Sequence, residues 1–556
     1  MSRPKLSELS LTEKIGQLLM VRQSVTVYKQ TENGFVARTQ EEIDEIMGKY
    51  QFGGIWSSGQ QLMNAIALAE SGERVPTWYN RKITQKMTNA VRLPVLVGLD
   101  AEFGAGGVFS DATNVSGPLA IGAADDTELT FAINAAIARE VKAAGANWKW
   151  SPVVDIPNRY NSASLGRGFS DNIEKIVKHA VASVRGSESE KIVSTIKHFP
   201  GYDPYEIRDS HFVTTSVNLS LDEWRNSQAK TFQGVIDAGV DSIMVGHTAF
   251  PAADDTMLNG QYIPATLSEK IIKGILRSEM GFEGVILTDA VNMSGFANLI
   301  PYEEALVMAV NAGNDMLLGV NPYDFEIIHK AVLDGRISME RIEESAERVL
   351  KLKEKIGLFD GITEEIDMFE QSKNTAFIDR KIAEKSVTLV YDKNNMLPLK
   401  QEKIKKVTIV CSSHFERTEA ELEIMKGEFE KRGASAEIIG DIAGPEEVKR
   451  LSEENDLIVY AAYIAAHRPM GMPSLYGDKI KTYFSAFTYG KEKSVGVSMG
   501  YPYLHIDCMT GANTFFNIYS TNPESQIAFV KVLYGELEAN TVSPVDIEPK
   551  LRYVYG

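Results

Sequence analysis

The chain has 556 residues, of which 44% are hydrophobic and 24% charged, and a formal charge of −17 at neutral pH. This length exceeds what one hydrophobic core supports, so we expect two or three domains. The acidic balance argues against a nucleic-acid-binding protein, which would carry a basic patch or stripe. Two cysteines cannot build a disulfide framework. Neither a signal-peptide pattern nor a run of ~20 apolar residues is visible, so we expect a cytoplasmic protein without a membrane partner.

The first 320 residues repeat one pattern, in which a long amphipathic helix, a glycine and a short apolar strand follow one another. A glycine ends a helix most easily because it adopts the left-handed conformation without strain, and Gly145, Gly239, Gly281 and Gly313 occupy such positions. Eight short apolar segments follow, each typical of a strand buried on both faces: 15–21, 52–56, 94–100, 147–153, 191–199, 240–247, 284–289 and 314–319. Eight such strands alternating with helices predict a (β/α)8 barrel of the TIM type.

The first of these segments has an alternative interpretation. Residues 15–21 could instead form the apolar face of a helix, because Ser10 and Glu13 stand at the spacing of a capping box.

A second α/β pattern follows the barrel. Segments 387–391, 406–411, 434–439, 456–463 and 494–499 are strand candidates, and helices are expected near 416–432, 445–453 and 524–536. The pattern predicts a smaller α/β sandwich domain. We therefore divide the chain into a barrel domain over 1–360, a linker over 361–385 and a C-terminal domain over 386–556.

Titratable side chains collect where the predicted barrel strands end. Active sites of such barrels lie at the carboxyl ends of the strands, so residues at these positions are candidates for chemistry. Asp100, Lys197 with His198, His247 and Asp289 each end one predicted strand, and Asp155 and Arg167 follow another. Any one of them could be an ordinary loop charge or a core histidine, but their coincidence at neighbouring strand ends predicts an active site.

The most specific segment is IKHFPGYDPYEIRDSHF over 196–212, in which prolines and a glycine interrupt regular structure. Asp209 and His211 stand two residues apart in it. A carboxylate beside an imidazole fixes its tautomer and raises its basicity, although the same spacing could serve only an Asx-type turn. A divalent metal site formed by these residues and the neighbouring histidines is an alternative, but no recognised zinc spacing is present and we expect no metal or cofactor.

These residues resemble a known family. The motif KHFPG…DSH over 197–211, MVGHTAFPA over 244–252, the segment ending GVILTDAVNM at 293 and LDAEFG over 99–104 are similar to glycoside hydrolase family 3, and more narrowly to its β-N-acetylglucosaminidase branch. The resemblance covers residues 8–360 well and extends faintly into the second domain. The sequence departs from the family pattern in its loop, where Tyr202 replaces a second histidine and the spacing is one residue longer than usual. It also has Asp289–Ala290 in place of two adjacent aspartates, and the sequence GRGF around Arg167 in place of GxRSF.

The resemblance implies a role for each candidate residue. Asp289 matches the nucleophile, and His211 matches a general acid/base with Asp209 as its partner. Residues that match those holding the terminal sugar are Asp100, Arg167, Lys197, His198 and His247.

The implied function is a retaining, exo-acting β-N-acetylhexosaminidase that releases N-acetylglucosamine from peptidoglycan fragments or chitooligosaccharides through a covalent glycosyl-aspartate. A phosphorylase that uses phosphate as acceptor and a family 3 β-glucosidase are the alternatives. The expected partner is the oligosaccharide or amino-sugar glycoside alone, with the protein a monomer or homodimer.

Overall fold

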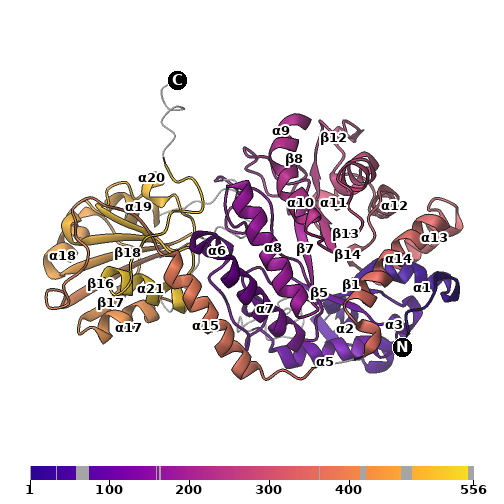
Figure 1. Ribbon diagram of the computed structural model, residues 1–556, viewed down its shortest axis with the longest axis horizontal. Coiled ribbons are helices and arrows are strands. Elements are labelled where there is room, and N and C mark those ends of the chain that lie inside the picture. Colours follow the sequence, from indigo (N-terminus) through magenta and orange to yellow (C-terminus); the bar gives the residue numbers. More distant parts are fainter. Residues whose placement is uncertain are drawn as a thin grey trace. The chain divides into compact units, whose positions relative to one another are not determined.

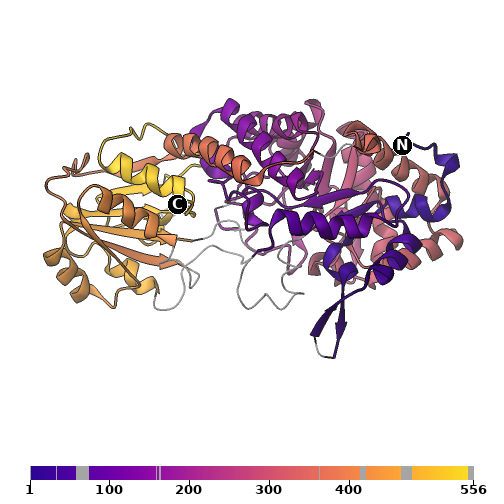
Figure 2. The same ribbon diagram turned by 90° about the horizontal axis from the view of Figure 1, so that it is seen from below.

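A computed structural model gives the fold (Figures 1 and 2) and describes residues 2–32, 34–57, 74–157, 159–161, 164–361, 364–413, 421–464 and 479–548. The chain forms two compact units. The first comprises residues 1–114, 130–156 and 177–375, and the second comprises 115–129, 157–176 and 376–556. The domain boundaries drawn from the sequence, at 360 and 386, stay a prediction.

The first unit contains a closed sheet of eight parallel strands. The strands are β1 (Leu19–Arg22), β4 (Gly54–Trp56), β5 (Leu96–Leu99), β6 (Trp148–Lys149), β7 (Val193–Phe199), β9 (Ser242–Val245), β13 (Val285–Thr288) and β14 (Leu317–Val320). Their order is β13-β9-β7-β6-β5-β4-β1-β14, and a parallel bridge between Leu287 and Met316 joins the two ends of this order. The predicted (β/α)8 barrel is thereby confirmed.

Helices alternate with these strands. They are α1 (Leu11–Gln17), α2 (Gln23–Val27), α3 (Gln40–Tyr50), α5 (Thr77–Thr88), α7 (Thr127–Ala143), α8 (Ile173–Ser189), α9 (Leu221–Asn226), α10 (Gln228–Asp237), the π-helix η5 (Lys270–Glu279), α11 (Ser294–Ala297), α12 (Tyr302–Ala312), α13 (Asp324–Leu333) and α14 (Met339–Lys355). Short strand pairs complete the unit: β2 (Tyr28–Thr31) with β3 (Gly34–Ala37), β8 (Thr215–Ser216) with β10 (Thr248–Ala249), and β11 (Met257–Leu258) with β12 (Gln261–Tyr262). Single 3-10 turns are η1 (Leu6–Glu8), η3 (Ala105–Gly107), η4 (Ala265–Leu267) and η6 (Leu358–Asp360).

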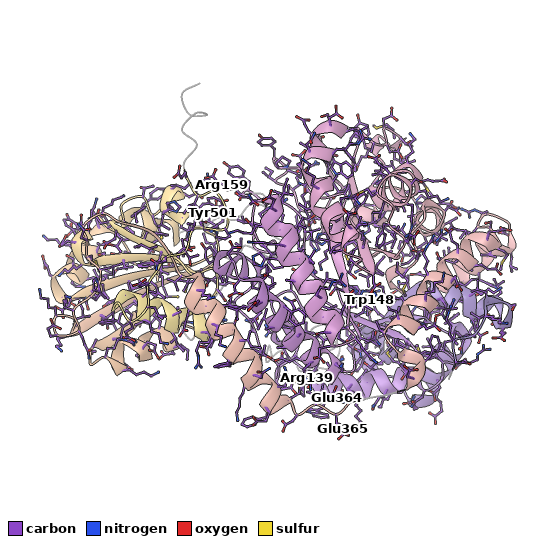
Figure 3. All side chains as sticks on the ribbon, viewed as in Figure 1. Arg139, Trp148, Arg159, Glu364, Glu365 and Tyr501 are labelled. Atoms are coloured by element: carbon purple, nitrogen blue, oxygen red, sulfur yellow. The ribbon has the colours of Figure 1, made fainter. Side chains whose placement is uncertain are left out.

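Large apolar side chains fill the barrel. Trp148, labelled in Figure 3, is fully buried with Trp150 among residues of the other strands, and its indole N–H donates to Thr195 Oγ1 at 2.5 Å. Gly98 of β5 faces this layer, and a Cβ atom there would lie 2.5 Å from the Trp150 ring. A glycine is therefore required in β5 to make room for the tryptophan, as close packing of interiors demands.

The observed strands are shorter than the predicted segments, and the first and the fourth differ most. The capping box opens α1, because the Ser10 backbone N–H donates to Glu13 Oε2 at 2.8 Å and the Glu13 N–H donates back to Ser10 Oγ at 3.2 Å. Residues 15–17 are therefore helical, and β1 starts only at Leu19. Of the segment 147–153, only Trp148–Lys149 pairs as strand β6.

The second unit contains a six-stranded sheet. Its strands are β15 (Thr388–Asp392), β16 (Lys406–Ser413), β17 (Ser435–Ile439), β18 (Leu457–Tyr463), β19 (Ser494–Ser498) and β20 (Thr514–Asn517), in the order β15-β20-β19-β18-β16-β17. All neighbours are parallel except β15 and β20. Strand β20 was missed by the sequence analysis. The helices are α6 (Pro118–Ala124), α15 (Met368–Ser386), α17 (Glu423–Lys431), α18 (Pro445–Glu454), α19 (Lys479–Ser485), α20 (Leu504–Asp507) and α21 (Pro523–Leu533), with the 3-10 turn η7 (Lys491–Lys493). Residues 414–420 of one expected helix lie outside the described residues.

A buried carboxyl group stabilises the helices of this second unit. Asp379 of α15 is 1% exposed and accepts hydrogen bonds from the Ser116 backbone N–H, at 2.8 Å, and from the side-chain amide of Asn522, which caps α21. Because no cation is among these partners, burial raises the pKa of Asp379 to about 7.

Among the described residues, no helix combines the length and the apolar composition that crossing a bilayer would require.

Candidate active site

The barrel brings most of the predicted site residues to one end of its sheet. Asp289 directly follows β13, His247 comes two residues after β9, and Asp100 directly follows β5. Lys197 and His198 are the two residues before Phe199, the last residue of β7. Because all eight strands are parallel, these positions share the carboxyl end of the barrel, where barrel enzymes hold their active sites.

Asp289 is ionised throughout the physiological range. Its backbone N–H donates to the Val245 carbonyl at 2.8 Å, which ties it to the end of β9, and its Oδ1 accepts the Ala290 N–H at 2.7 Å. Burial alone would raise the pKa of this carboxyl, but the charges of His198, His247 and His211 outweigh burial and lower the pKa to about 2. A carboxylate that the charges of three histidines keep ionised is suited to act as a nucleophile.

Lys197 lies between two carboxylates. Its Nζ is 2.7 Å from Asp100 Oδ1 and 2.6 Å from Glu102 Oε1. The lysine side chain is 2% exposed and that of Glu102 8%, whereas 52% of the Asp100 side chain is accessible. The Asp100 carboxylate is therefore accessible from outside the protein, while Glu102 holds the lysine from the buried side. The sequence analysis missed Glu102, although it stands inside the quoted LDAEFG motif.

His198 is paired with Asp155. Its Nδ1 lies 2.7 Å from Asp155 Oδ2, and its backbone N–H donates to the same carboxylate at 3.0 and 3.1 Å. The Asp155 side chain is fully buried and that of His198 is 5% exposed. The sequence placed Asp155 at a strand end but indicated no partner for it.

His247 is buried and contacts the residue after Asp289. Its Nε2 is 3.0 Å from the Ala290 carbonyl and its Nδ1 is 3.0 Å from Thr266 Oγ1. A carbonyl only accepts, so Nε2 donates and the threonine hydroxyl is the partner of Nδ1. Burial lowers the pKa of His247. Both ring nitrogens thus support the turn after β13, and contact with a sugar would require one of these bonds to open.

The loop after β7 carries the predicted acid/base pair. His211 Nδ1 lies 2.6 Å from Asp209 Oδ1, and the His211 backbone N–H donates to the same oxygen at 2.9 Å. The Asp209 side chain is 2% exposed and that of His211 34%. The backbone contact is the Asx-type turn that the sequence offered as an alternative, and the same carboxylate holds the ring. The turn and the side-chain pair therefore coexist.

Hydrogen bonds within the loop hold its shape. Asp203 accepts the backbone N–H groups of Tyr205 at 2.8 Å and Asn218 at 2.6 Å, and Glu206 accepts those of Arg208 at 2.9 Å and Ser216 at 3.4 Å. Asp203 and Glu206 therefore bind backbone N–H groups of the loop, and the predicted Asp209–His211 pair lies further along the chain.

The loop rests on the segment after β13. The Ser294 backbone N–H donates to the His211 carbonyl at 3.4 Å, and Thr214 Oγ1 donates to the Gly295 carbonyl at 3.2 Å. A Cβ atom at Gly295 would lie 2.9 Å from the Ser210 carbonyl oxygen and 3.1 Å from His247 Cβ. The absence of a side chain at Gly295 therefore lets the loop of Asp209 and His211 approach the segment that follows Asp289.

Arg167 follows the fourth barrel strand in the sequence. It lies in the segment 157–176, which folds with the second unit, and its backbone N–H donates to the Ser164 carbonyl at 3.3 Å. Its predicted contact with the sugar stays a prediction.

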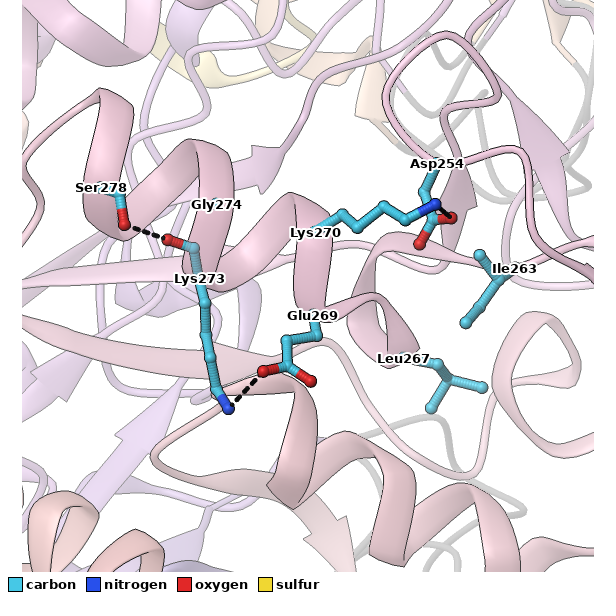
Figure 4. A pocket seen from close by; sticks show the side chains of 8 residues that line it. All are labelled: Asp254, Ile263, Leu267, Glu269, Lys270, Lys273, Gly274 and Ser278. Atoms are coloured by element: carbon cyan, nitrogen blue, oxygen red, sulfur yellow. Dashed lines mark hydrogen bonds and ion pairs between the residues drawn. The ribbon is translucent and has the colours of Figure 1, made fainter.

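A groove on the barrel has a different lining from this site. It runs along η5 and contains Asp254, Glu269, Lys270, Lys273 and four further residues (Figure 4), none of them a predicted site residue. Its charges pair with one another: Lys270 Nζ lies 2.9 Å from Asp254 Oδ1, and Lys273 Nζ lies 2.9 Å from Glu269 Oε1. Within the described part of the chain, no three His, Cys, Asp or Glu side chains are grouped as metal ligands.

A closed (β/α)8 barrel unit that contains an ionised carboxylate and an Asp–His pair has the two kinds of group that retaining glycoside hydrolysis needs, a nucleophile and a proton donor. Residues 10–352 match the family model described as "Glycosyl hydrolase family 3 N terminal domain", so the chain belongs to glycoside hydrolase family 3. The resemblance read from the sequence is thereby confirmed, and the chain is a glycoside hydrolase.

Several similar proteins cover nearly the whole chain, and others cover part of it. A β-N-acetylglucosaminidase/β-glucosidase of Cellulomonas fimi is 25% identical over 98% of this chain and 95% of that protein. A β-hexosaminidase A of Pseudoalteromonas piscicida is 26% identical over 57% of this chain and 55% of that protein. Among solved structures, a β-glucoside phosphorylase superimposes with a TM-score of 0.83 at 25% identity, covering 97% of this chain and 95% of that one. A family 3 β-N-acetylglucosaminidase of Paenibacillus sp. str. FPU-7, at 24% identity and 97% and 99% coverage, has a TM-score of 0.79 and shares the fold.

Proposed function

We propose that the protein is a retaining, exo-acting β-N-acetylhexosaminidase that removes terminal N-acetylglucosamine from peptidoglycan fragments or chitooligosaccharides. The observation that carries the proposal is the Asp209–His211 pair on the loop after β7, at 2.6 Å, in the same unit as the ionised Asp289. The names of the Cellulomonas and Pseudoalteromonas relatives, both of which include hexosaminidase-type activities, support it.

In the first step, a carboxylate oxygen of Asp289 attacks the anomeric carbon and the bond from that carbon to the leaving oxygen breaks. Protonated His211 gives its Nε2 proton to the leaving oxygen, because its Nδ1 is held by Asp209. The Asp209 carboxylate stabilises the imidazolium before this transfer. The products are the free aglycone and a glycosyl ester of Asp289.

In the second step, neutral His211 takes a proton from water while the water oxygen attacks the anomeric carbon. The ester bond to Asp289 breaks, and the sugar leaves with its original β configuration. Both carboxylate and imidazole return to their starting states. Asp100 and Lys197 are proposed to hold the hydroxyl groups of the terminal sugar, and His198, His247 and Arg167 are the further predicted sugar-binding residues.

Two other activities remain as candidates because named relatives carry them. A β-glucoside phosphorylase shares the fold across nearly the whole chain, and the Cellulomonas relative is named for both N-acetylglucosaminide and glucoside hydrolysis. A histidine base is neutral after it has given up its proton, so it repels an incoming phosphate less than a carboxylate base would. Phosphate in place of water would yield a sugar 1-phosphate.

The test is hydrolysis of p-nitrophenyl β-N-acetylglucosaminide beside the β-glucoside, with and without phosphate, for wild type, His211→Ala and Asp289→Ala. We expect preference for the N-acetyl sugar and loss of that activity in both variants. A rate that depends on phosphate, with sugar 1-phosphate as product, would make the protein a phosphorylase. Preference for the glucoside would make it a β-glucosidase, and a fully active His211→Ala enzyme would remove His211 from the chemistry.

A further inference from the structure

The barrel holds two Asp–His pairs of the same geometry and opposite exposure. In each, a carboxylate oxygen meets the histidine Nδ1, at 2.7 Å for Asp155–His198 and 2.6 Å for Asp209–His211. The His211 side chain is 34% exposed and the His198 side chain 5%. A partly exposed imidazole can exchange protons with water and substrate, whereas an enclosed one is held in one orientation. The second pair is therefore suited to fixing charge and hydrogen-bond direction.

The chain segment before Asp155 runs beside the end of β7. Val153 forms a parallel bridge with Lys197, and the Val154 backbone N–H donates to the Lys197 carbonyl at 3.0 Å. The hydrogen bond between Val154 and Lys197 brings the residues that follow them, Asp155 and His198, next to each other. The pair is thus built by backbone pairing and does not depend on the mobility of two side chains.

The Asp155 carboxylate is fully buried and accepts hydrogen bonds from both the backbone and the ring of His198. A buried carboxylate is costly unless it is paired, so the two residues act as one unit. A carboxylate can only accept, and Nδ1 is therefore the ring nitrogen that carries a hydrogen. Nε2 is the atom left to interact with other groups of the site.

His198 is also tied to the nucleophile electrostatically. Of the three histidines whose charge lowers the pKa of Asp289, His198 has the largest effect, ahead of His247 and His211. The ring of Tyr202 packs edge-on against His198, with centroids 5.6 Å apart. Among the described residues, the titratable groups that interact with His198 include Asp155, Asp289, His247 and Tyr202.

We propose that Asp155 is a positioning residue of the active site, which fixes the Nδ1–H tautomer and the orientation of His198 and so sets how His198 acts on the bound sugar and on Asp289. This inference deepens the proposed function and rests on it. Asp155 itself touches neither sugar nor reacting atoms, and all of its effect passes through His198.

The test is a double-mutant cycle with Asp155→Asn, His198→Gln and the double variant, assayed on p-nitrophenyl β-N-acetylglucosaminide. Loss of one partner leaves a buried polar group poorly satisfied, so we expect Asp155→Asn to lower kcat/KM about 10- to 100-fold. If Asp155 acts through His198, the same substitution in the His198→Gln background lowers it less than about threefold. Independent, multiplicative losses would overturn the inference.

The matched control is Asp254→Asn, another buried aspartate of the barrel that bonds Ser268, Thr256 and Lys270 at the groove of Figure 4. It should leave kcat/KM within about twofold of wild type. An equal loss of activity in this control and in Asp155→Asn would mean that general destabilisation explains both, and would overturn the inference.

A readout independent of activity, and of whether the Asp155→Asn variant folds, is ¹⁵N NMR of histidine-labelled protein. The chain has 8 histidines, and the signal missing from His198→Gln identifies His198. We expect a hydrogen-bonded proton on its Nδ1 in the wild type. An unprotonated Nδ1 would overturn the pair. A wild type that cleaves neither the N-acetylglucosaminide nor the glucoside would instead overturn the proposed function, and the NMR result would still decide the pair.

Discussion

One oxygen of Asp209 accepts both the Nδ1–H and the backbone N–H of His211, at 2.6 and 2.9 Å. Holding the main chain and the ring through a single atom fixes the imidazole relative to its own loop, so the ring and the loop move together. Because the two residues form one unit, the role of the pair can be tested by comparing substrates whose leaving groups differ in quality.

A histidine that protonates the leaving oxygen matters most when that oxygen is a poor leaving group. We expect His211→Ala to lower kcat/KM about 10²- to 10⁴-fold for an alkyl or sugar aglycone, and much less for a 2,4-dinitrophenyl aglycone, which leaves without protonation. Asp209→Asn should show the same dependence with a smaller loss. Steady-state kinetics on the two N-acetylglucosaminides measures the contrast, and equal losses on both would argue that His211 is not the acid.

Asp289→Asn removes the proposed nucleophile while keeping the shape of the side chain, and should lower kcat by about 10⁴-fold or more on every substrate. Because the leaving group does not matter to this loss, the pattern differs from that of His211. Mass spectrometry of protein incubated with a slow fluorinated substrate should find the sugar attached to the Asp289 peptide. Attachment at another carboxylate would refute the assignment.

The pH dependence of Asp289 follows from its lowered pKa. The ordinary value is 3.8 and the folded value about 2, so ionised Asp289 contributes stability that is complete above about pH 4 and is lost as the pH falls towards 2. We therefore expect no carboxyl ionisation with a pKa between 3.5 and 5 in kcat/KM for the dinitrophenyl substrate. Initial rates from pH 3.5 to 8 test this expectation. A fall of kcat/KM near pH 4 that is caused by protonation of Asp289 would contradict it.

The strand ends were predictable because buried parallel strands are short apolar runs, and a polar residue directly after such a run is conspicuous. Asp100, His247 and Asp289 were found in this way, and the structure places each where its strand ends. The boundaries were less predictable where local and tertiary preferences compete. Residues 15–17 are helical because the capping box of Ser10 and Glu13 stabilises α1, although the apolar run suggested a strand.

Pairings between distant segments could not be read from the sequence. The Asp155–His198 contact depends on the register between residues 153 and 197, and the Glu102–Lys197 contact depends on the backbone path after β5. Strand β20 was missed because four residues, TFFN, are too few to show a period. The sequence also did not show that the chain between 157 and 176, which carries Arg167, folds with the second unit.

Asp379 predicts a different pH dependence, that of stability. Its pKa is raised from 3.8 to about 7, so the folded state favours the neutral carboxyl. As the pH rises from about 4 to about 7, the unfolded chain loses this proton while the folded chain keeps it. The free energy of unfolding then falls by at most about 1.4 kcal/mol per pH unit and levels off above pH 7.

Asp379→Asn should remove this part of the pH dependence, because an amide does not titrate. Thermal denaturation of wild type and variant between pH 4.5 and 8 measures the difference in slope. Parallel curves would show that Asp379 is ionised in the folded protein. Asp254→Asn serves as the control, since hydrogen bonds to Ser268, Thr256 and Lys270 lower the pKa of Asp254 in spite of its burial, and its pH effect is confined to acid solution.

Gly295 connects the position of the acid/base loop to catalysis. A Cβ atom there would press on the Ser210 carbonyl at 2.9 Å and on His247 Cβ at 3.1 Å, both of them backbone or near-backbone atoms that cannot rotate away. We expect Gly295→Val to push the loop off the segment after β13 and to lower kcat/KM about tenfold or more for poor leaving groups, since small misplacements of a catalytic group are costly. The dinitrophenyl substrate should be nearly unaffected, because Asp289 stays in place.

Gly274→Ala in η5 is the matched control, as its Cβ would meet no atom within 4 Å. If Gly295→Val slowed both substrates equally, the damage would lie at the nucleophile through His247, and the loop would not be what Gly295 accommodates.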